Sequence, residues 1–246
     1  MDRLLEATAR AERDHFWFRG FRRFMAPLLA EAVRDRAAPT ILDCGCGTGH
    51  NLSMLRQFGR AVGIDFTWTG LAYAHGKGEQ AIAQATATRL PFADARFDVV
   101  TSFDVIYALE DEAEAEALGE MFRVLRPGGY LVLNAAAMDL LRGNHSVLAN
   151  EVRRYNRATL TERLTRTGFD VRRMSYTNAT ILPIVAAVRL LQRLSGHEES
   201  QQEIAIPPAP VNAALTAALA VEAALIRVVN MPFGSSLMAL AQKPNH

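Results

Sequence analysis

The sequence predicts a doubly wound α/β fold with a mostly parallel sheet, and three observations carry this prediction. Short β-branched apolar runs alternate with helical stretches from about residue 40 to residue 177. The run FDVVTSF (97–103) is apolar enough to be a strand buried on both faces, as in parallel sheets. A glycine-rich stretch, ILDCGCGTGH (41–50), overlaps and follows the first of these strands. Such alternation places helices on both faces of the sheet.

The elements follow in order along the chain. We expect strands at TILDC (40–44), AVGID (61–65), near 81–85, FDVVTSF (97–103), YLVLNA (130–135), FDVRRMSYT (169–177) and SLMALAQK (236–243). We expect helices at 51–58, 68–76, 112–125, 158–168, about 181–194 and 211–229. Pro127 with Gly128 and Gly129 is expected to stop one helix, and Gly168 another.

Composition narrows the class of protein. The 246 residues are 50% hydrophobic and 22% charged, which is enough for one large packed domain. The net charge of +1 gives no basic excess, so we expect no nucleic-acid partner. The charged N-terminus does not resemble a signal peptide, and no uninterrupted apolar run is long enough to span a membrane. With two cysteines that cannot easily pair with each other, we expect a cytoplasmic protein.

The glycine stretch is expected to form the ligand site, because ligands of open parallel sheets sit beyond the carboxyl ends of the strands. Its spacing, Gly45-x-Gly47-x-Gly49, differs from the G-x-G-x-x-G of dinucleotide enzymes, and no P-loop lysine follows it. Asp43 stands two residues before the first glycine, where it disfavours a phosphate and suits a cation. Asp65 ends the second strand, where a carboxylate can accept hydrogen bonds from ribose hydroxyls. The pattern fits S-adenosylmethionine, an adenosine with an amino-acid tail.

The chain resembles the class I S-adenosylmethionine-dependent methyltransferases, which are Rossmann-like. The resemblance rests on ILDCGCGTGH, VGID, TRLPFADARFDVV and FRVLRPGGYLVL, in that order, and covers about residues 38–178. It implies a seven-stranded sheet whose last strand is antiparallel. The last two strands of this fold normally form a hairpin, so the apolar helical stretches between residues 179 and 231 are expected to be an insertion before the last strand. It also implies a cofactor, S-adenosylmethionine, that leaves as S-adenosylhomocysteine.

The resemblance assigns roles to particular residues. The loop of Gly45, Cys46, Gly47 and Gly49 should pass close to the methionine part of the cofactor, with Asp43 nearby. Asp65 should hold the ribose and Phe66 should lie against the adenine. The adenine edge should meet Thr86, Ala87 and Thr88, and the methyl-donor pocket should be lined by Phe103 and Asp104. Thr86 departs from the family, which usually has an acid there, so we expect a weaker acceptor for the adenine amino group.

Residues 144–156 are expected on the substrate side. This segment and the stretches HFWFRGFRR (15–23) and PFGSSLMALAQKP (232–244) resemble a bacterial small-molecule subgroup of these methyltransferases. His145 is the candidate general base and Tyr155 a second catalytic candidate; an ordinary loop histidine is the alternative. Phe18, Tyr107, Arg153 and Arg154 are the candidate substrate contacts, although the arginines would equally cap a helix or pair with Glu151. Ser146 and Glu151 replace an Asp and a second His of some members, so no metal or two-His mechanism carries over.

The resulting division is a helical lid (1–36), a methyltransferase core (37–178), a helical insertion (179–231) and a final strand (232–246). In the lid, Phe16, Trp17 or Phe18 would cover the cofactor and Arg19 would lie near its carboxylate, unless the segment is simply a packed helix. The insertion is a cap over an apolar substrate, a homodimer interface or a peripheral membrane contact.

We expect methyl transfer to a small-molecule or lipid-like acceptor. The alternatives are an inactive cofactor-binding regulator and an NAD-type oxidoreductase. No Cys/His cluster has metal-site spacing, so no metal is expected.

Overall fold

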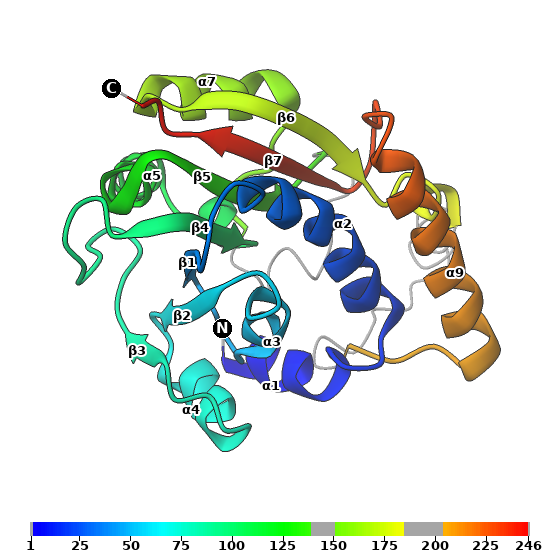
Figure 1. Cartoon of the computed structure of the whole chain (residues 1–246). Helices are drawn as coiled ribbons and strands as arrows, with labels where there is room; N and C mark the ends of the chain where they lie inside the picture. The colour runs from blue at the N-terminus through cyan, green and yellow to red at the C-terminus, as the bar shows by residue number, and fades with distance from the viewer. Residues whose placement is uncertain (1, 139–150, 185–203, 246) are drawn as a thin grey trace.

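A computed structural model describes residues 2–138, 151–184 and 204–245 of the chain. Within these residues the strands form one seven-stranded sheet in the order β3-β2-β1-β4-β5-β7-β6 (Figure 1). The strands are β1 (Thr40–Cys44), β2 (Arg60–Asp65), β3 (Ile82–Gln84), β4 (Phe97–Phe103), β5 (Leu125–Ala136), β6 (Asp170–Thr177) and β7 (Ser236–Gln242). The helices are α1 (Asp2–Ala11), α2 (Phe16–Ala32), α3 (His50–Leu55), α4 (Trp68–Gly76), α5 (Asp111–Val124), α7 (Arg157–Thr167) and α9 (Ala209–Ile226), with a 3-10 turn η1 (Ile106–Ala108).

The strand directions confirm the predicted fold class. The pairs β1–β2, β1–β4, β2–β3 and β4–β5 are parallel, whereas β7 runs antiparallel to both β5 and β6. The chain leaves β1 toward β2 and β3 and then returns to β4 on the other side of β1. This reversal of strand order places the carboxyl ends of β1 and β4 where α/β proteins of this kind bind ligands.

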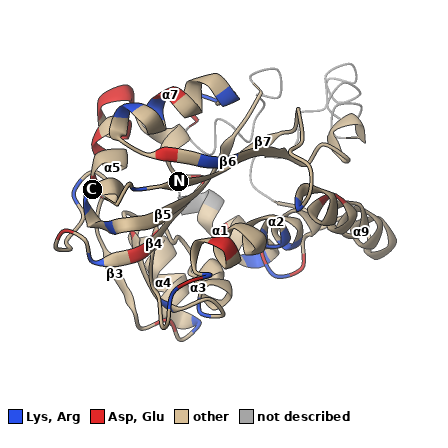
Figure 2. Ribbon diagram, turned by 45° about the horizontal axis from the view of Figure 1, so that its top comes forward, with Lys and Arg blue, Asp and Glu red and all other residues tan. Residues whose placement is uncertain are grey.

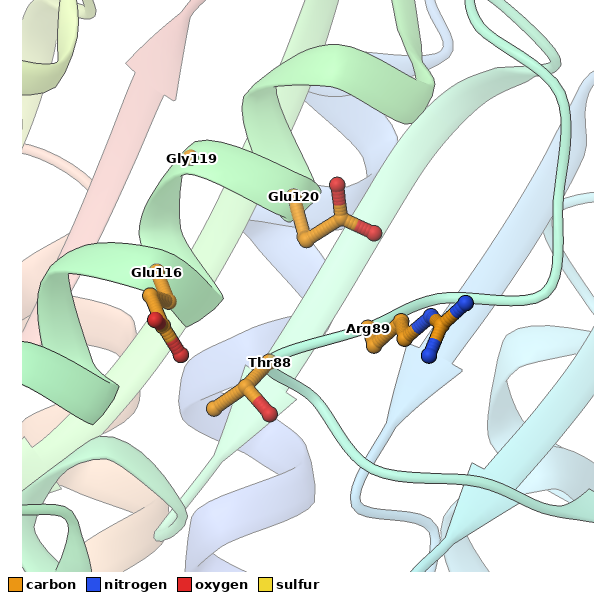
Figure 3. Close-up of a pocket in the computed structure, with 5 residues that line it drawn as sticks. All are labelled: Thr88, Arg89, Glu116, Gly119 and Glu120. Carbon is orange, nitrogen blue, oxygen red and sulfur yellow. The ribbon is translucent and has the colours of Figure 1, made fainter.

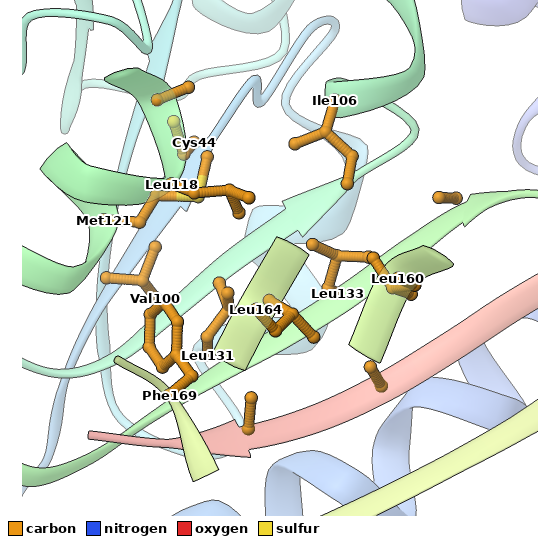
Figure 4. Packing of buried hydrophobic residues seen from close by; sticks show 14 of the residues in the cluster. Cys44, Val100, Ile106, Leu118, Met121, Leu131, Leu133, Leu160, Leu164 and Phe169 are labelled. Atoms are coloured by element: carbon orange, nitrogen blue, oxygen red, sulfur yellow. The ribbon is translucent and has the colours of Figure 1, made fainter. Parts of the chain in front are cut away.

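Two apolar layers sandwich the sheet. One buries the faces of α5 and α7, with Leu118, Met121, Leu160 and Leu164 packed on Val100 and Leu133, as Figure 4 shows. The other buries α2, α3, α4 and α9, with Met25, Leu28, Leu52, Leu71 and Leu219 on Ile41 and Val132. All seven residues of β4 are buried, as expected for a central strand, and the one charged residue among them, Asp98, is paired with Arg36 and Arg126.

Local sequence signals mark both ends of α7. Asn156 caps α7, where its side chain accepts the Thr159 N–H at 2.9 Å, and Gly168 closes the helix with φ +107°. The Arg-Pro-Gly-Gly segment differs slightly from the prediction. The helix α5 ends at Val124 as expected, but the strand already begins at Leu125 and includes these residues. The helix expected at about 181–194 falls mostly outside the described residues.

Candidate functional site

The glycine loop turns sharply at the carboxyl end of β1. Gly45, Gly47 and Gly49 have φ of +89°, +50° and +74°, a conformation that other residues adopt only with strain. The Gly45 and Cys46 N–H groups each donate to the Ile64 carbonyl at 2.8 Å, so the loop is fastened to β2. A Cβ on Gly45 would lie 2.2 Å from Val105 Cγ2, which leaves no room for a larger residue.

Asp43 lies buried beneath this loop. Its Oδ1 accepts the Thr101 hydroxyl from β4 at 2.6 Å, while Oδ2 has no hydrogen-bond partner within the described structure. Burial is the main cause that raises the pKa of Asp43 to about 7, and the charge of Asp65 adds to the effect. A buried carboxyl oxygen without a partner, beside a glycine turn, suits a cationic group and repels a phosphate. The residues therefore fit the amino-acid end of S-adenosylmethionine.

Asp65 and Phe66 end β2 on the other side of the loop. The Asp65 Oδ2 accepts the Gly47 N–H at 2.7 Å, and Oδ1 accepts the Thr67 N–H at 2.8 Å. The carboxylate therefore supports the loop itself, a role that the sequence does not reveal. Oδ1 also accepts the Thr67 hydroxyl at 2.5 Å, whereas Oδ2 keeps a further lone pair for a ligand. Phe66 is 74% exposed, so its ring is accessible to a ligand.

The other predicted adenine contacts lie after β3. The Thr86 and Thr88 hydroxyls are 2.9 Å apart and all three residues from Thr86 to Thr88 are half-buried. A separate depression of about 520 Å³ begins at Thr88 and extends over α5, lined by Arg89, Glu116, Gly119 and Glu120 (Figure 3). Its acidic lining on the outer side of α5 is distinct from the glycine loop, and we assign it no role in the site.

Phe103 is the last residue of β4, and Asp104 follows it at the same edge of the sheet. The Phe103 ring packs edge-on against Phe21 of α2, with centroids 5.0 Å apart. Asp104 adopts φ +60°, and its Oδ1 accepts the Asn134 amide of β5 at 2.8 Å. Its surface is accessible to solvent, yet desolvation by the surrounding protein raises the pKa of Asp104 to about 7.

The N-terminal helices contact the loop from outside. The buried carboxylate of Glu12, just after α1, accepts the Thr48 hydroxyl at 2.5 Å and pairs with Lys77 at the end of α4. Leu5 of α1 would lie 3.5 Å from a Cβ on Gly47. Glu12 could not be recognised from the sequence, because its partners Thr48 and Lys77 are 36 and 65 residues away and no local motif indicates that they pair with it.

The HFWFR segment forms the beginning of α2. His15 is the helix cap and accepts the Trp17 N–H at 3.2 Å, and the His15 ring stacks on Phe16. Phe16 and Trp17 pack on the apolar layer around α2, which agrees with the packed-helix alternative. Phe18 is half-buried and Arg19 is exposed on the same helix.

The structure places the substrate-side candidates differently from the expectation. Tyr155 is buried in the core with its hydroxyl 3.4 Å from the Ile106 carbonyl, so its position does not support a catalytic role. Arg153 forms ion pairs with Asp111 and Glu114 of α5. Arg154 pairs with Glu151 at 2.9 Å, which agrees with the alternative that the arginines pair with Glu151 and do not contact a substrate. The buried Tyr107 accepts the Val152 N–H through its carbonyl. These residues join segment 151–155 to α5 and η1. His145 lies outside the described residues.

Both cysteines are buried, and burial raises the pKa of each thiol above its usual range. A Cβ on Gly63 would lie 2.8 Å from the Cys46 Sγ, so Cys46 fills space between the loop and β2. This packing agrees with the structural interpretation of the two thiols.

Comparisons with known proteins agree with this geometry. Residues 42–133 match a family model described as a methyltransferase domain. A probable S-adenosylmethionine-dependent methyltransferase of Mycolicibacterium smegmatis is 32% identical over 163 residues, which are 64% of this chain and 61% of that protein. A demethylmenaquinone methyltransferase of Thermus thermophilus is 39% identical over 108 residues, 40% of this chain and 48% of that protein. The chain thus spans about half to three fifths of the length of these relatives.

Solved structures share the fold. The phosphoethanolamine N-methyltransferase 2 of Haemonchus contortus, in complex with S-adenosylmethionine, superimposes with a TM-score of 0.63. It is 20% identical, and the alignment covers 99% of this chain and 57% of that one. The family match identifies residues 42–133 as a methyltransferase domain, the similarity to a probable S-adenosylmethionine-dependent methyltransferase extends over 64% of the chain, and the solved structures share the fold.

Proposed function

We propose that this protein transfers a methyl group from S-adenosylmethionine to a small-molecule or lipid-like acceptor. The observation that carries the proposal is the buried, unpartnered Oδ2 of Asp43 beside the Gly45–Gly49 turn. The Asp43 carboxyl would repel the negative charge of a pyrophosphate, whereas it would attract the cationic group of an amino-acid tail. The arrangement therefore also argues against an NAD-type oxidoreductase.

On the cofactor side, the glycine loop and Asp43 would hold the methionine part, Asp65 the ribose and Phe66 the adenine face. Thr86 to Thr88 would contact the adenine edge. The N-terminal helices would act as a lid, because Glu12 already links α1 to Thr48 of the loop. When bound, the cofactor supplies an electrophilic methyl group on a sulfonium for in-line displacement by the acceptor.

On the acceptor side, we propose Asp104 as the group that orients the nucleophile or accepts its proton. The Asn134 amide fixes one carboxylate oxygen, and the left-handed backbone turns the side chain away from β4. A carboxyl whose pKa is about 7 is suited to exchange protons near neutral pH. Phe103, held by Phe21, would provide an apolar wall next to it.

A lipid-like acceptor is supported by the similarity to a demethylmenaquinone methyltransferase and by the apolar insertion around α9. Because both thiols are free and buried, we propose that the protein acts in the reducing cytoplasm.

The proposal is tested by mixing the purified protein with S-adenosylmethionine and a panel of quinol, phenol, amine and carboxylate acceptors, followed by quantification of S-adenosylhomocysteine. Turnover with one class supports the proposal. If the cofactor binds but no acceptor is methylated and Asp104→Asn changes nothing, the chain is better described as a cofactor-binding regulator. The dependence on pH of kcat/KM for the acceptor, measured at saturating S-adenosylmethionine so that the Asp43 proton does not contribute, adds a second readout: it should rise through about pH 7 in the wild type and lose this rise in Asp104→Asn.

A further inference from the structure

The outer face of α9 is an exposed apolar surface. Val221 is 60% exposed, and Val228, just after the helix, is 80% exposed. Spacings of three and four residues place the exposed side chains on one stripe, which continues into the following turn. We call this stripe the α9 face; it consists of Val211, Ala214, Ala217, Val221, Ala224, Leu225, Val228, Val229 and Phe233. Contiguous apolar surfaces of this kind mark interaction sites.

The fold keeps charge away from this face. Glu222 is the one ionisable residue between Ala209 and Ile226, and it is fully buried on the opposite side. It accepts the Ala179 and Thr180 N–H groups, each at 2.9 Å, and the Thr180 hydroxyl at 2.6 Å. The carboxylate thus fastens α9 to the end of β6 and leaves the outer stripe uncharged.

The inner side of α9 is packed on α2. A Cβ on Gly20 would lie 2.4 Å from Leu219 Cδ1, so the two helices approach closely at this point. The Arg23 guanidinium donates to the Thr216 carbonyl at 3.3 Å, and Asn212 accepts the Phe16 N–H at 2.9 Å. Although α9 is long and apolar enough by length and composition to cross a membrane, this packed side fits a helix that lies along a surface.

Exposed cations flank the apolar stripe. Arg19 and Arg23 are exposed on α2, and Arg227 is exposed directly after α9. Figure 2 shows basic residues on α2 beside α9, whose one acidic residue, Glu222, is buried. The exposed acid next to the start of α9, Asp14, has Arg13 4.0 Å away. The α9 face therefore combines apolar side chains with a positive margin.

We propose that the α9 face docks on the surface of a lipid bilayer that contains anionic phospholipids. Such a surface offers acyl chains to the valines and phosphate groups to the arginines at the same time. A second copy of this chain fits less well, because a two-fold interface brings the same cations together. The proposal goes beyond methyl transfer, since docking requires neither cofactor nor acceptor.

The test is flotation of the full-length protein with vesicles of phosphatidylcholine, with or without phosphatidylglycerol. The protein should float with the anionic vesicles, and added salt should reduce the bound fraction. Val228→Asp should lower partitioning by at least about tenfold, as expected when a buried valine is lost. Arg227→Gln should lower it by about fivefold, as expected for one basic side chain near a charged membrane.

Matched controls lie on the opposite side of the sheet. Ala158→Asp and Arg166→Gln make the same charge changes on exposed positions of α7 and should leave partitioning unchanged. Circular dichroism verifies that each variant is folded. The proposal is overturned if the wild type does not float with anionic vesicles, or if the α9 and α7 variants behave alike. Concentration-dependent dimerisation in light scattering that Val228→Asp abolishes, without vesicle binding, would instead assign the face to a homodimer. Calorimetry with S-adenosylmethionine tests the methyltransferase proposal separately.

Discussion

The buried carboxyl of Asp43 should make both folding and cofactor binding depend on pH. Asp43 is 1% exposed, and its pKa of about 7 compares with an ordinary value of 3.8. This difference of about three units corresponds to about 4 kcal/mol in favour of the protonated carboxyl in the folded protein. Asp43→Asn retains the size of the side chain and an oxygen for the Thr101 hydroxyl, but it does not titrate.

The direction in which the free energy of unfolding changes with pH follows from the raised pKa of Asp43. Between about pH 4 and pH 7 the folded protein binds the Asp43 proton more tightly than the unfolded chain does. The stabilisation of the folded protein by this proton is therefore complete below pH 4. It is lost as the pH rises to 7, at about 1.4 kcal/mol per pH unit. The free energy of unfolding of Asp43→Asn, relative to the wild type, should increase by up to about 4 kcal/mol over this range. Urea unfolding of both proteins at several pH values measures this increase. Asp104 titrates in both proteins, so its contribution cancels in the difference.

Cofactor binding should show the opposite dependence on the Asp43 proton. A cation beside Oδ2 favours the ionised carboxylate, so binding below pH 7 requires release of the proton. The affinity of the wild type for S-adenosylmethionine should fall about fivefold from pH 7 to pH 6, and that of Asp43→Asn should lack this component. Calorimetry at both pH values measures it, and the ligand's own amino group affects both proteins equally. Equal pH slopes in the two proteins would refute the assignment of Asp43 to the cofactor's cationic end.

Three further substitutions test the site. Gly45→Ala should abolish measurable cofactor binding and lower Tm, because its Cβ meets Val105; Gly78→Ala, with the same φ of +89° and open space around it, is the control for backbone strain alone. Phe66→Ala should lower affinity by about fivefold to tenfold without changing Tm, as expected for loss of one stacked ring, whereas Phe233→Ala should not affect affinity. Thr86→Asp should raise affinity severalfold in calorimetry, because a carboxylate is the stronger acceptor, and unchanged affinity would show that Thr86 does not contact the adenine.

Much of the fold could be predicted because its signals are local. The buried run of β4, the three glycines after β1 and the glycine at the end of α7 each determine structure within a few residues. The predicted strands appear within a few residues of their expected ends, apart from the earlier start of β5 at Leu125. The antiparallel β7 came from the family resemblance and is confirmed by its pairing with β5 and β6.

The contacts that complete the site could not be predicted, because they join residues far apart in the sequence. Thr101 reaches Asp43 across 58 residues, and Glu12 reaches Thr48 across 36. Segment 151–155 illustrates the same limit. Its arginines and tyrosine have the composition of a polar site, but Glu114 of α5 and the Ile106 carbonyl hold Arg153 and Tyr155 in structural roles. Composition shows which groups are available, whereas packing determines which of them face a ligand.

The central claim is that the Gly45–Gly49 loop binds S-adenosylmethionine, and calorimetric titration of the wild type with S-adenosylmethionine and with NAD tests it most directly. We expect saturable binding of one S-adenosylmethionine per chain, loss of this binding in Gly45→Ala, retention in Gly78→Ala and no heat of binding with NAD. Binding of NAD in place of S-adenosylmethionine, or S-adenosylmethionine binding that Gly45→Ala leaves intact, would contradict the account.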